Sequence, residues 1–177
     1  MSFKEVSFND LQLNPATLIG KEWLLITAGN ETAGYNTMTA SWGHLGTIWK
    51  RPGDKNPSLP TAVTYIRPQR YTKEFVDRED IYTLTFFDET YKKALGYLGS
   101  HSGRDEDKVA KAGLTPLFSD GTTYFEEAKM VLICRKLYRA PLVAEGFIDK
   151  SLIDICYENG DFHDMYVGEI LKVLVKE

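Results

Sequence analysis

The sequence contains few of the residues from which enzymes build reactive centres. Its 177 residues include two cysteines, Cys134 and Cys156, which form no Cys-x-x-Cys pair and so give no sign of a thiol redox centre. The three histidines, His44, His101 and His163, lie far apart and show no known metal-ligand spacing. The sequence also lacks the Gly-x-Ser-x-Gly turn of the nucleophile elbow, so a serine hydrolase of that kind is not supported.

Other protein classes are disfavoured by what the composition lacks. The formal net charge of −4 leaves no basic excess of the kind that nucleic-acid binders show. No apolar run approaches the roughly 20 residues of a membrane helix. The start of the chain lacks the charged and then apolar segments of a signal peptide, and both cysteines lie in apolar runs, where buried thiols are expected rather than a disulfide. We therefore expect a cytoplasmic protein with neither nucleic acid nor membrane as a partner.

The glycine fingerprints of nucleotide-binding α/β proteins are absent as well. Neither the dinucleotide Gly-x-Gly-x-x-Gly pattern nor a Gly-Lys-Ser/Thr phosphate loop occurs in the sequence. Strands and helices do not alternate regularly, which disfavours a doubly wound parallel sheet. What is present is a hydrophobic content of 43% and an aromatic content of 12%, which suit a globular, strand-rich protein. The length predicts one domain covering residues 1–177.

Apolar runs between turn residues predict seven or eight strands. We place them at residues 23–28, 36–43, 61–67, 81–87, 128–139, 142–148, 152–157 and 164–175. Short helices are predicted at 15–20, at 71–78, after Asp88 and at 105–112. Asn159-Gly160 predicts a hairpin between the last two strands. The pattern is that of a mainly β protein, an antiparallel barrel or sandwich with short inserted helices.

The rest of the chain is organised around the stretch from Asn36 to Trp49. Because side chains alternate across a strand, the first part of this stretch has two faces. One carries Asn36, Met38, Ala40 and Trp42, and the other carries Thr37, Thr39, Ser41 and Gly43. A packed face backed by a face of small hydroxyls suits a flat ligand with polar edges. The alternative is an ordinary strand and hairpin with Trp42 and Trp49 in the core.

Two further segments have the composition of anion-binding sites. The first is Arg67-Pro68-Gln69-Arg70-Tyr71-Thr72. It places two arginines, whose planar guanidinium groups donate paired hydrogen bonds, next to the backbone N–H groups of a predicted helix start. The second is Ser102-Gly103-Arg104, followed by Lys108. For the first segment a solvated turn is an equal alternative, and for the second simple helix capping is the stronger one. Asp161-Phe162-His163-Asp164 has the composition of metal ligands or an acid–base pair, although a solvated turn explains it better.

Taken in order, these segments resemble the flavin reductase-like, FMN-binding split-barrel family, with the flavoredoxin branch nearest. The resemblance covers about residues 20–175 and includes Asp107-Lys108 and Gly168-Glu169. It implies a Greek-key split β-barrel and a homodimer with FMN near its interface. It assigns the isoalloxazine ring to Asn36, Thr37, Met38, Thr39, Ala40, Ser41 and Trp42. It assigns the phosphate to Arg67, Arg70, Tyr71, Thr72, Ser102, Gly103 and Lys108, and it places His163 near the ring or its partner.

Two functions follow from this resemblance, and the sequence does not separate them, because the chemistry belongs to the cofactor. One is an oxidoreductase that takes hydride from NADH or NADPH onto FMN and passes electrons to an unidentified acceptor. The other is an FMN electron carrier without nicotinamide turnover of its own. A small-molecule-binding barrel without flavin is a third alternative. The loop from Lys50 to Pro60 is long for this family and is expected to affect access for a second substrate.

Overall fold

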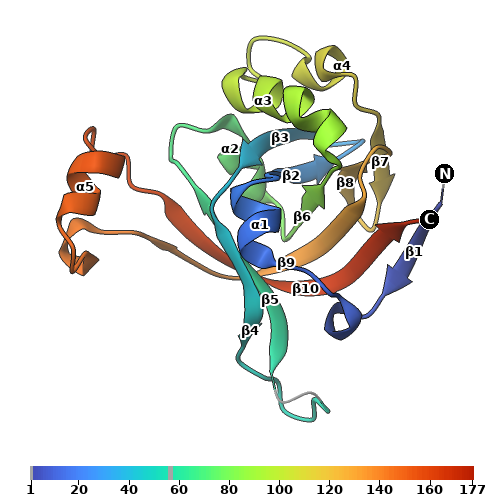
Figure 1. Ribbon diagram of the computed structural model, residues 1–177, viewed down its shortest axis with the longest axis horizontal. Helices are drawn as coiled ribbons and strands as arrows, with labels where there is room; N and C mark the ends of the chain where they lie inside the picture. Colours follow the sequence, from blue (N-terminus) through green and yellow to red (C-terminus); the bar gives the residue numbers. More distant parts are fainter. Residues whose placement is uncertain (1, 56–57) are drawn as a thin grey trace.

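An eight-stranded antiparallel sheet forms the frame of the protein (Figure 1). The computed structural model describes residues 2–55 and 58–177. The strands run in the order β3-β2-β6-β9-β10-β5-β4, and β1 pairs with β10 beside this path. Their bounds are β1 Phe3–Val6, β2 Leu24–Asn30, β3 Gly34–Ala40, β4 Gly43–Ile48, β5 Leu59–Ile66, β6 Ile81–Phe86, β9 Met130–Pro141 and β10 Asp164–Lys176. A separate hairpin joins β7 (Pro116–Ser119) to β8 (Thr122–Phe125).

The two end strands of the main sheet, β3 and β4, are neighbours in the chain. Only Ser41 and Trp42 separate Ala40, the last residue of β3, from Gly43, the first residue of β4. Yet β3 pairs with β2 and β4 pairs with β5, at opposite ends of the strand order. The sheet therefore curls until its two edges meet at this short link. Among the described residues no ladder joins β3 to β4, so the outer edge of β3 stays unpaired.

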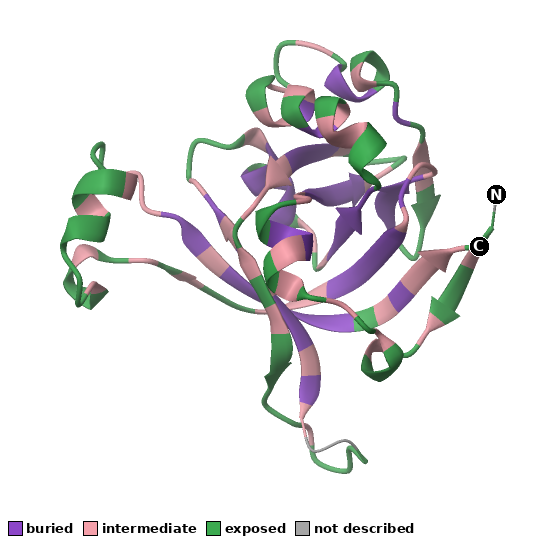
Figure 2. Cartoon of the chain, in the orientation of Figure 1, coloured by how far each residue is buried: buried purple, intermediate pink, exposed green. Residues whose placement is uncertain are grey.

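Both faces of the central strands are buried, as Figure 2 shows. Because residues alternate across a strand, β2 sends Leu24 and Ile26 into one hydrophobic core and Leu25 into another. In the same way, Leu132 and Val131 of β9 enter opposite cores. Burial on both faces explains why these strands appear in the sequence as continuous apolar runs.

Short helices cover the sheet and approach the end of β3. They are α1 Pro15–Gly20, α2 Tyr71–Arg78, α3 Lys92–Ser100, α4 Lys108–Ala112 and α5 Ser151–Cys156, with 3-10 turns η1 Phe8–Asp10, η2 Glu89–Tyr91 and η3 Ala144–Gly146. The start of α1 is as predicted, because Asn14 Oδ1 accepts hydrogen bonds from the backbone N–H groups of Ala16 and Thr17. Leu95 and Leu98 of α3 enter the second core. None of the described helices has the length and apolarity needed to cross a bilayer.

Gly168 is required by close packing inside the barrel. A Cβ atom there would lie 2.3 Å from the hydroxyl oxygen of Tyr82, a fully buried side chain. The ladder between β10 and β9 also shifts register between Val167 and Gly168. The glycine that follows Val167 thus lets the ring of Tyr82 cross directly beneath β10.

Two arms extend from the barrel (Figure 1). One is the β4–β5 hairpin, which ends in the loop predicted between Lys50 and Pro60; Asn56 and Pro57 of that loop lie outside the described residues. The other consists of the ends of β9 and β10 with α5 between them. Apolar side chains on this second arm face solvent, including Ile148 and Ile155, which are 97% and 77% exposed.

In the second arm the observed secondary structure differs from the sequence prediction. Residues 142–148 and 152–157 were predicted as strands, but the structure has η3 and α5 there. The Asn159-Gly160 turn joins α5 to β10 and closes no hairpin of two adjacent strands. The apolar positions in 152–156 fit helical spacing as well as a short buried strand, so such a run does not distinguish the two. In addition, β1, β4, β7 and β8 were not predicted as separate strands.

Candidate functional site

The predicted site residues gather where β3 ends beside the start of α2. A pocket of about 240 Å³ lies there, and it draws on β3, the Ser41–Trp42 link, β5 and the residue before β10. Its lining comprises Met38, Thr39, Ala40, Ser41, Trp42, Tyr65, Arg67, Arg70 and His163. Segments that are more than 120 residues apart in the sequence therefore share one cavity.

The hydroxyl face predicted for β3 reaches this pocket only in part: Thr39 and Ser41 line it, whereas Thr37 does not. Thr37 is fully buried, and its Oγ1 lies 2.7 Å from Oγ1 of Thr27 on the neighbouring strand. Thr39 donates its hydroxyl hydrogen to the carbonyl oxygen of Leu95 in α3, at 2.5 Å. The unpaired backbone edge of β3 also borders the pocket, at residues 38–40, and the link of Ser41 and Trp42 continues the same wall. A polar-edged ring can meet N–H and C=O groups along such an edge.

The prediction that Trp42 lies on the packed face of the strand is also wrong. Trp42 is 45% exposed, since it lies beyond the end of β3 in the link to β4. Its ring centroid lies 5.0 Å from that of His163. Trp49, which the simpler explanation placed in the core, is exposed as well. Trp42 therefore forms part of the pocket wall.

Asn36 connects the strand to both predicted anion-binding segments. Its Nδ2 donates to Oγ1 of Thr72 in the first turn of α2, at 2.8 Å, and both side chains are buried. A Cβ atom on Gly103 would lie 2.2 Å from Oδ1 of Asn36 and 3.5 Å from a ring carbon of Tyr71. Only glycine fits this approach, which brings the loop after α3 against the start of α2. The two segments thus form one site.

The cations in this site differ in how their charge is balanced. Arg67 forms an ion pair with Asp161 and donates to the carbonyl oxygen of Cys156. Arg104 pairs with Glu74, and Ser102 Oγ accepts a hydrogen bond from the backbone N–H of Arg104. These contacts leave little free charge on either arginine.

Arg70 and Lys108 carry the charge that remains unbalanced. Among the described residues, neither forms an ion pair with a carboxylate. Arg70 donates to the carbonyl oxygen of Gly99, and Lys108 Nζ donates to those of Leu98 and His101, at 2.9 and 3.0 Å. Burial, together with the nearby positive charge of Arg70, lowers the pKa of Lys108 to about 8. Glu106 opposes this pKa shift through its charge but forms no ion pair with Lys108. Two neighbouring cations that are not paired with a carboxylate among the described residues are the chemistry that a phosphate group requires.

His163 stands on the opposite side of the pocket. Its Nδ1 lies 2.9 Å from the hydroxyl oxygen of Tyr157, and both side chains are buried. Burial, and next the charge of Arg67, lower the pKa of His163 to about 4, so that the ring is neutral at pH 7. Asp164, by contrast, pairs with Lys73 and Arg139 away from the pocket. The motif Asp161–Asp164 thus supplies a neutral imidazole to the site rather than a cluster of acids.

Sequence reasoning missed two tyrosines. Tyr65 lines the pocket from β5, two positions before Arg67, and this spacing placed both on one face of the strand. Tyr157 lies at the end of α5, in a segment predicted as a strand, and no local signal connected it to His163.

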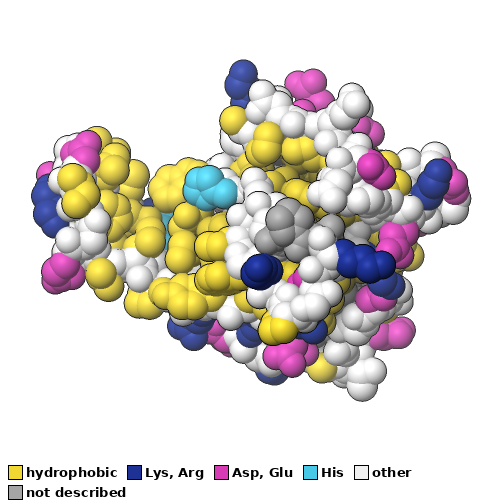
Figure 3. Space-filling view, turned by 90° about the horizontal axis from the view of Figure 1, so that it is seen from below, with side chains coloured by type: hydrophobic (Ala, Val, Ile, Leu, Met, Phe, Trp, Pro, Cys, Tyr) yellow, Lys and Arg dark blue, Asp and Glu magenta, His cyan; other side chains and the backbone are white. Residues whose placement is uncertain are grey.

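A larger apolar pocket adjoins the first. It has a volume of about 750 Å³ and shares Ser41, Trp42 and Tyr65 with the smaller pocket. Its other lining residues are Asn14, Pro15, Ala16, Ile19, Gly20, Gly43, His44, Leu45, Leu142 and Tyr157, without Asp, Glu, Lys or Arg. Hydrophobic side chains cover a broad area between the α5 arm and the barrel in Figure 3. The two pockets are adjacent: charged side chains line the smaller one, and none lines the larger one.

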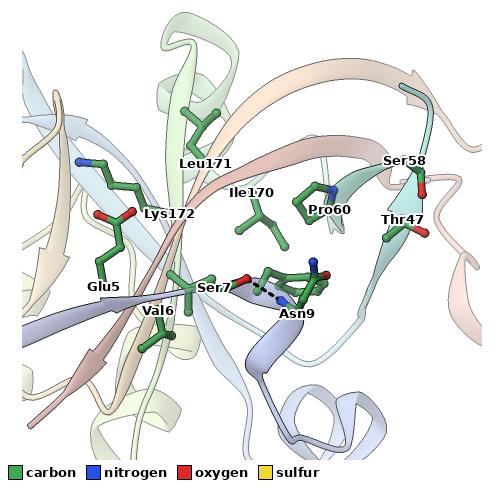
Figure 4. Close-up of a pocket in the computed structure, with 12 residues that line it drawn as sticks. Glu5, Val6, Ser7, Asn9, Thr47, Ser58, Pro60, Ile170, Leu171 and Lys172 are labelled. Atoms are coloured by element: carbon green, nitrogen blue, oxygen red, sulfur yellow. Dashed lines mark hydrogen bonds between the residues drawn. The ribbon is translucent and has the colours of Figure 1, made fainter. Parts of the chain in front are cut away.

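A third cavity, of about 420 Å³, lies elsewhere, between β1, β5 and β10 (Figure 4). Its walls include Val6, Asn9, Thr47, Pro60 and Ile170. None of the predicted site residues reaches it. It is therefore separate from the site described above.

Comparison with known proteins defines the fold. No protein-family model matches the sequence, and no curated protein matches it significantly. Among solved structures, an FMN-binding domain of a flavin reductases-like enzyme from Shewanella baltica OS155 aligns with a TM-score of 0.65 at 13% identity, over 98% of this chain and 77% of that one. Flavoredoxin of Desulfovibrio vulgaris (Miyazaki F) aligns with a TM-score of 0.62 at 22% identity, over 88% and 69%.

A third structure, nitrilotriacetate monooxygenase component B from Bacillus cereus, aligns with a TM-score of 0.64 at 17% identity, over 100% of this chain and 83% of that one. The observed fold is therefore that of the flavin reductase-like, FMN-binding split-barrel proteins. This confirms the fold that the sequence resemblance predicted. At these identities the likeness establishes architecture, and the function has to be argued from the site.

The buried charge of Lys108 predicts a pH-dependent stability in the ligand-free protein. The pKa of Lys108 is about 8 in the folded chain, against an ordinary value of 10.5. Between these values the unfolded chain holds a proton that the folded chain has lost, so stability rises with pH. We expect the free energy of unfolding of the wild type to increase, relative to Lys108→Met, between pH 8 and pH 10.5. Urea unfolding at several pH values measures the difference.

Lys111→Met is the matched control on the same helix. Lys111 is exposed, and its hydrogen bond with Glu106 raises its pKa, so its contribution to stability is lost as the pH rises through that value. Because that value lies above the ordinary 10.5, the difference between the wild type and Lys111→Met should stay nearly constant from pH 8 to pH 10.5. A constant difference between wild type and Lys108→Met would show that Lys108 is solvated.

Proposed function

We propose that the protein is an FMN-binding oxidoreductase of the flavin reductase-like kind. The observation that carries this proposal is the pair of cations, Arg70 and Lys108, which form no ion pair among the described residues, beside the unpaired edge of β3. The phosphate of FMN suits the two cations, and its flat ring with polar edges suits the unpaired strand edge. The similar structures from Shewanella baltica and Desulfovibrio vulgaris are an FMN-binding domain and a flavoredoxin, which supports the same ligand.

In this proposal the phosphate lies at the start of α2. Arg70 and Lys108 supply charge, and the first turn of α2, with Tyr71 and Thr72, supplies backbone N–H groups. Ser102 and Gly103, in the loop after α3, would form the other side of this phosphate-binding site. Asn36 holds Thr72 and packs against Gly103, so we assign it a positioning role between ring and phosphate. Arg67, already paired with Asp161, is assigned to the wall of the pocket.

The ring would lie along residues 38–42. Met38 and Ala40 form the floor, and the backbone edge of β3 offers hydrogen bonds to the ring's polar edge. Trp42 and His163 border it at the far end. Bound FMN would supply the redox chemistry, which needs no metal or activated nucleophile from the chain. The residues of the chain bind the cofactor, orient it and leave one side open to the apolar pocket.

The proposed reaction is hydride transfer from NADH or NADPH, followed by electron delivery to an acceptor. The apolar pocket beside Trp42 and Tyr65 gives a second ring a place next to the first. Such contact between two oriented rings is the main requirement of hydride transfer.

One observation favours the electron-carrier alternative. The lining of the apolar pocket contains no lysine or arginine for the pyrophosphate of a nicotinamide nucleotide. In an electron carrier, the same apolar surface would instead receive a small neutral acceptor or a partner protein. The two functions therefore differ in what enters this pocket.

We also propose a homodimer. Apolar side chains at the α5 arm are exposed, among them Val143, Ile148, Leu152 and Ile155, and a second copy would bury them. The aromatic pair Trp49 and Tyr138, with ring centroids 6.2 Å apart, is exposed on the barrel as well. Exposed apolar and aromatic groups of this kind are typical of interfaces between subunits.

FMN binding is tested through its phosphate. We expect Arg70→Ala to weaken FMN about ten- to a hundredfold and to leave riboflavin, which has no phosphate, unchanged, since a charge-assisted contact contributes roughly 1.5–3 kcal/mol. Calorimetric titration of both ligands measures this. Arg78→Ala is the control at the other end of α2, where Arg78 pairs with Glu79. Equal losses for FMN and riboflavin would contradict the phosphate assignment, and a wild type that binds neither ligand would end the proposal.

Hydride transfer is tested without oxygen. We expect NADH or NADPH to bleach the blue-light absorbance of the FMN-loaded protein at a rate that saturates with nicotinamide concentration. Dithionite serves as the control for a flavin that can be reduced. Bleaching by dithionite alone would contradict the reductase function and leave the electron carrier.

The dimer is tested by light scattering. We expect twice the chain mass for the wild type and a single chain mass for the double variant Ile148→Asp, Ile155→Asp, because two buried charges would destabilise the interface. Phe118→Ser, on β7, removes an exposed aromatic far from the α5 arm and should stay dimeric. A monomeric wild type would rule out the assembly.

A further inference from the structure

Besides His163, the α5 arm brings one polar side chain to the two pockets, that of Tyr157. Its ring is held by aromatic neighbours on the same arm, with ring centroids 4.7 Å from Phe162 and 5.7 Å from Phe147. The guanidinium of Arg67 lies over the same ring, 5.2 Å from its centroid. These contacts fix the direction of the hydroxyl, which lies 2.9 Å from His163 Nδ1.

The direction of this hydrogen bond follows from what else the hydroxyl can reach. Tyr157 is buried, and among the described residues its hydroxyl has no other hydrogen-bond partner. A buried phenol whose hydrogen finds no acceptor is costly. The hydroxyl therefore donates to Nδ1, which must present its lone pair. A neutral imidazole has one ring proton, so that proton resides on Nε2.

The Nε2 atom is free to meet a ligand. No described residue forms a hydrogen bond with it, and it is not among the buried polar atoms that lack a partner. His163 lines the smaller pocket together with Trp42 and Arg70. The N–H group on Nε2 can therefore reach the ligand space.

We propose that Tyr157 is a positioning residue that holds His163 as the Nε2–H tautomer, which makes His163 an uncharged hydrogen-bond donor to the molecule bound in this pocket. This inference rests on the proposed function for the identity of that molecule, FMN. It goes beyond that function in assigning a role to Tyr157, at the end of α5, which would set the proton position of His163, just before β10.

The charges around His163 favour the neutral ring. Arg67 and Arg70 stand on the side of β5 and α2, and both oppose a positive imidazolium. Asp161 favours one, but it is paired with Arg67. Tyr65 and Tyr157 are uncharged at pH 7, and burial raises the pKa of each hydroxyl. A neutral donor can stabilise negative charge on a bound group without adding a third cation beside the two arginines.

The tautomer is measured directly by NMR. Protein labelled with ¹⁵N-histidine gives long-range ¹H–¹⁵N correlations that distinguish Nδ1–H from Nε2–H, and His44→Gln and His101→Gln assign the signals by elimination. In the wild type we expect the Nε2–H pattern for His163, retained from pH 8 down to about pH 5, since its pKa is about 4. Addition of FMN should shift the Nε2 signal.

Tyr157→Phe keeps the ring packing and removes the donor. Since a hydrogen bond to the Nδ1 lone pair stabilises the neutral ring, its loss should raise the pKa of His163 and produce a mixture of tautomers. Tyr65→Phe is the matched control: the rings of Tyr65 and His163 are 6.5 Å apart, but the Tyr65 hydroxyl lies 3.5 Å from His44 instead. This variant should leave the tautomer of His163 unchanged.

The outcomes separate this inference from the proposed function. A wild-type Nδ1–H pattern, or a Tyr157→Phe variant with unchanged tautomer and pKa, would overturn the positioning role. FMN that binds without moving the Nε2 signal would overturn the donor role. If FMN fails to bind while the Tyr157 effect is seen, the proposed function falls and the positioning role stands.

Discussion

The site depends on the free outer edge of β3. The chain leaves β3 at Ala40, passes through two residues and enters β4 at the opposite end of the sheet. The edge strand therefore keeps a row of backbone groups without sheet partners, which proteins generally cover. Here α2, α3 and the loop after α3 gather around it, through Asn36, Thr39 and Gly103. The pocket lies where these elements leave part of the β3 edge uncovered.

The burial of Lys108 is expected to lower the stability of the protein when no anion is bound. Lys108 is buried near Arg70 and is held by backbone carbonyl oxygens instead of a carboxylate. Burying an unpaired cation is unfavourable, and an anion bound between the two side chains offsets that penalty. If the proposed function holds, ligand binding and folding stability are linked through the same two residues.

The helix that carries Arg70 is anchored by an ionic cluster on its other side. Lys73 bridges Asp77 and Asp164, and Asp164 also pairs with Arg139 of β9. The hydroxyl of Tyr166 donates to Asp77 at 2.6 Å. These contacts join α2 to β9 and β10, the two strands that also carry the α5 arm.

The sequence by itself determined the elements whose apolar runs are long or whose end signals are strong. These include β2, β5, β6, β9 and β10, the Asn14 cap of α1, and the end of α4 at Gly113 in the left-handed conformation. It also placed the two cation-bearing segments, because arginine, lysine and glycine next to helix starts have a local chemical meaning. Only the tertiary structure decided that Thr37 turns toward Thr27, that Arg67 is neutralised by Asp161 while Arg70 is not, and that Tyr157 reaches His163. Those facts depend on which strand is left at the edge and on how the segment between β9 and β10 contacts Arg67 at the end of β5, and both are set by contacts between residues far apart in the chain.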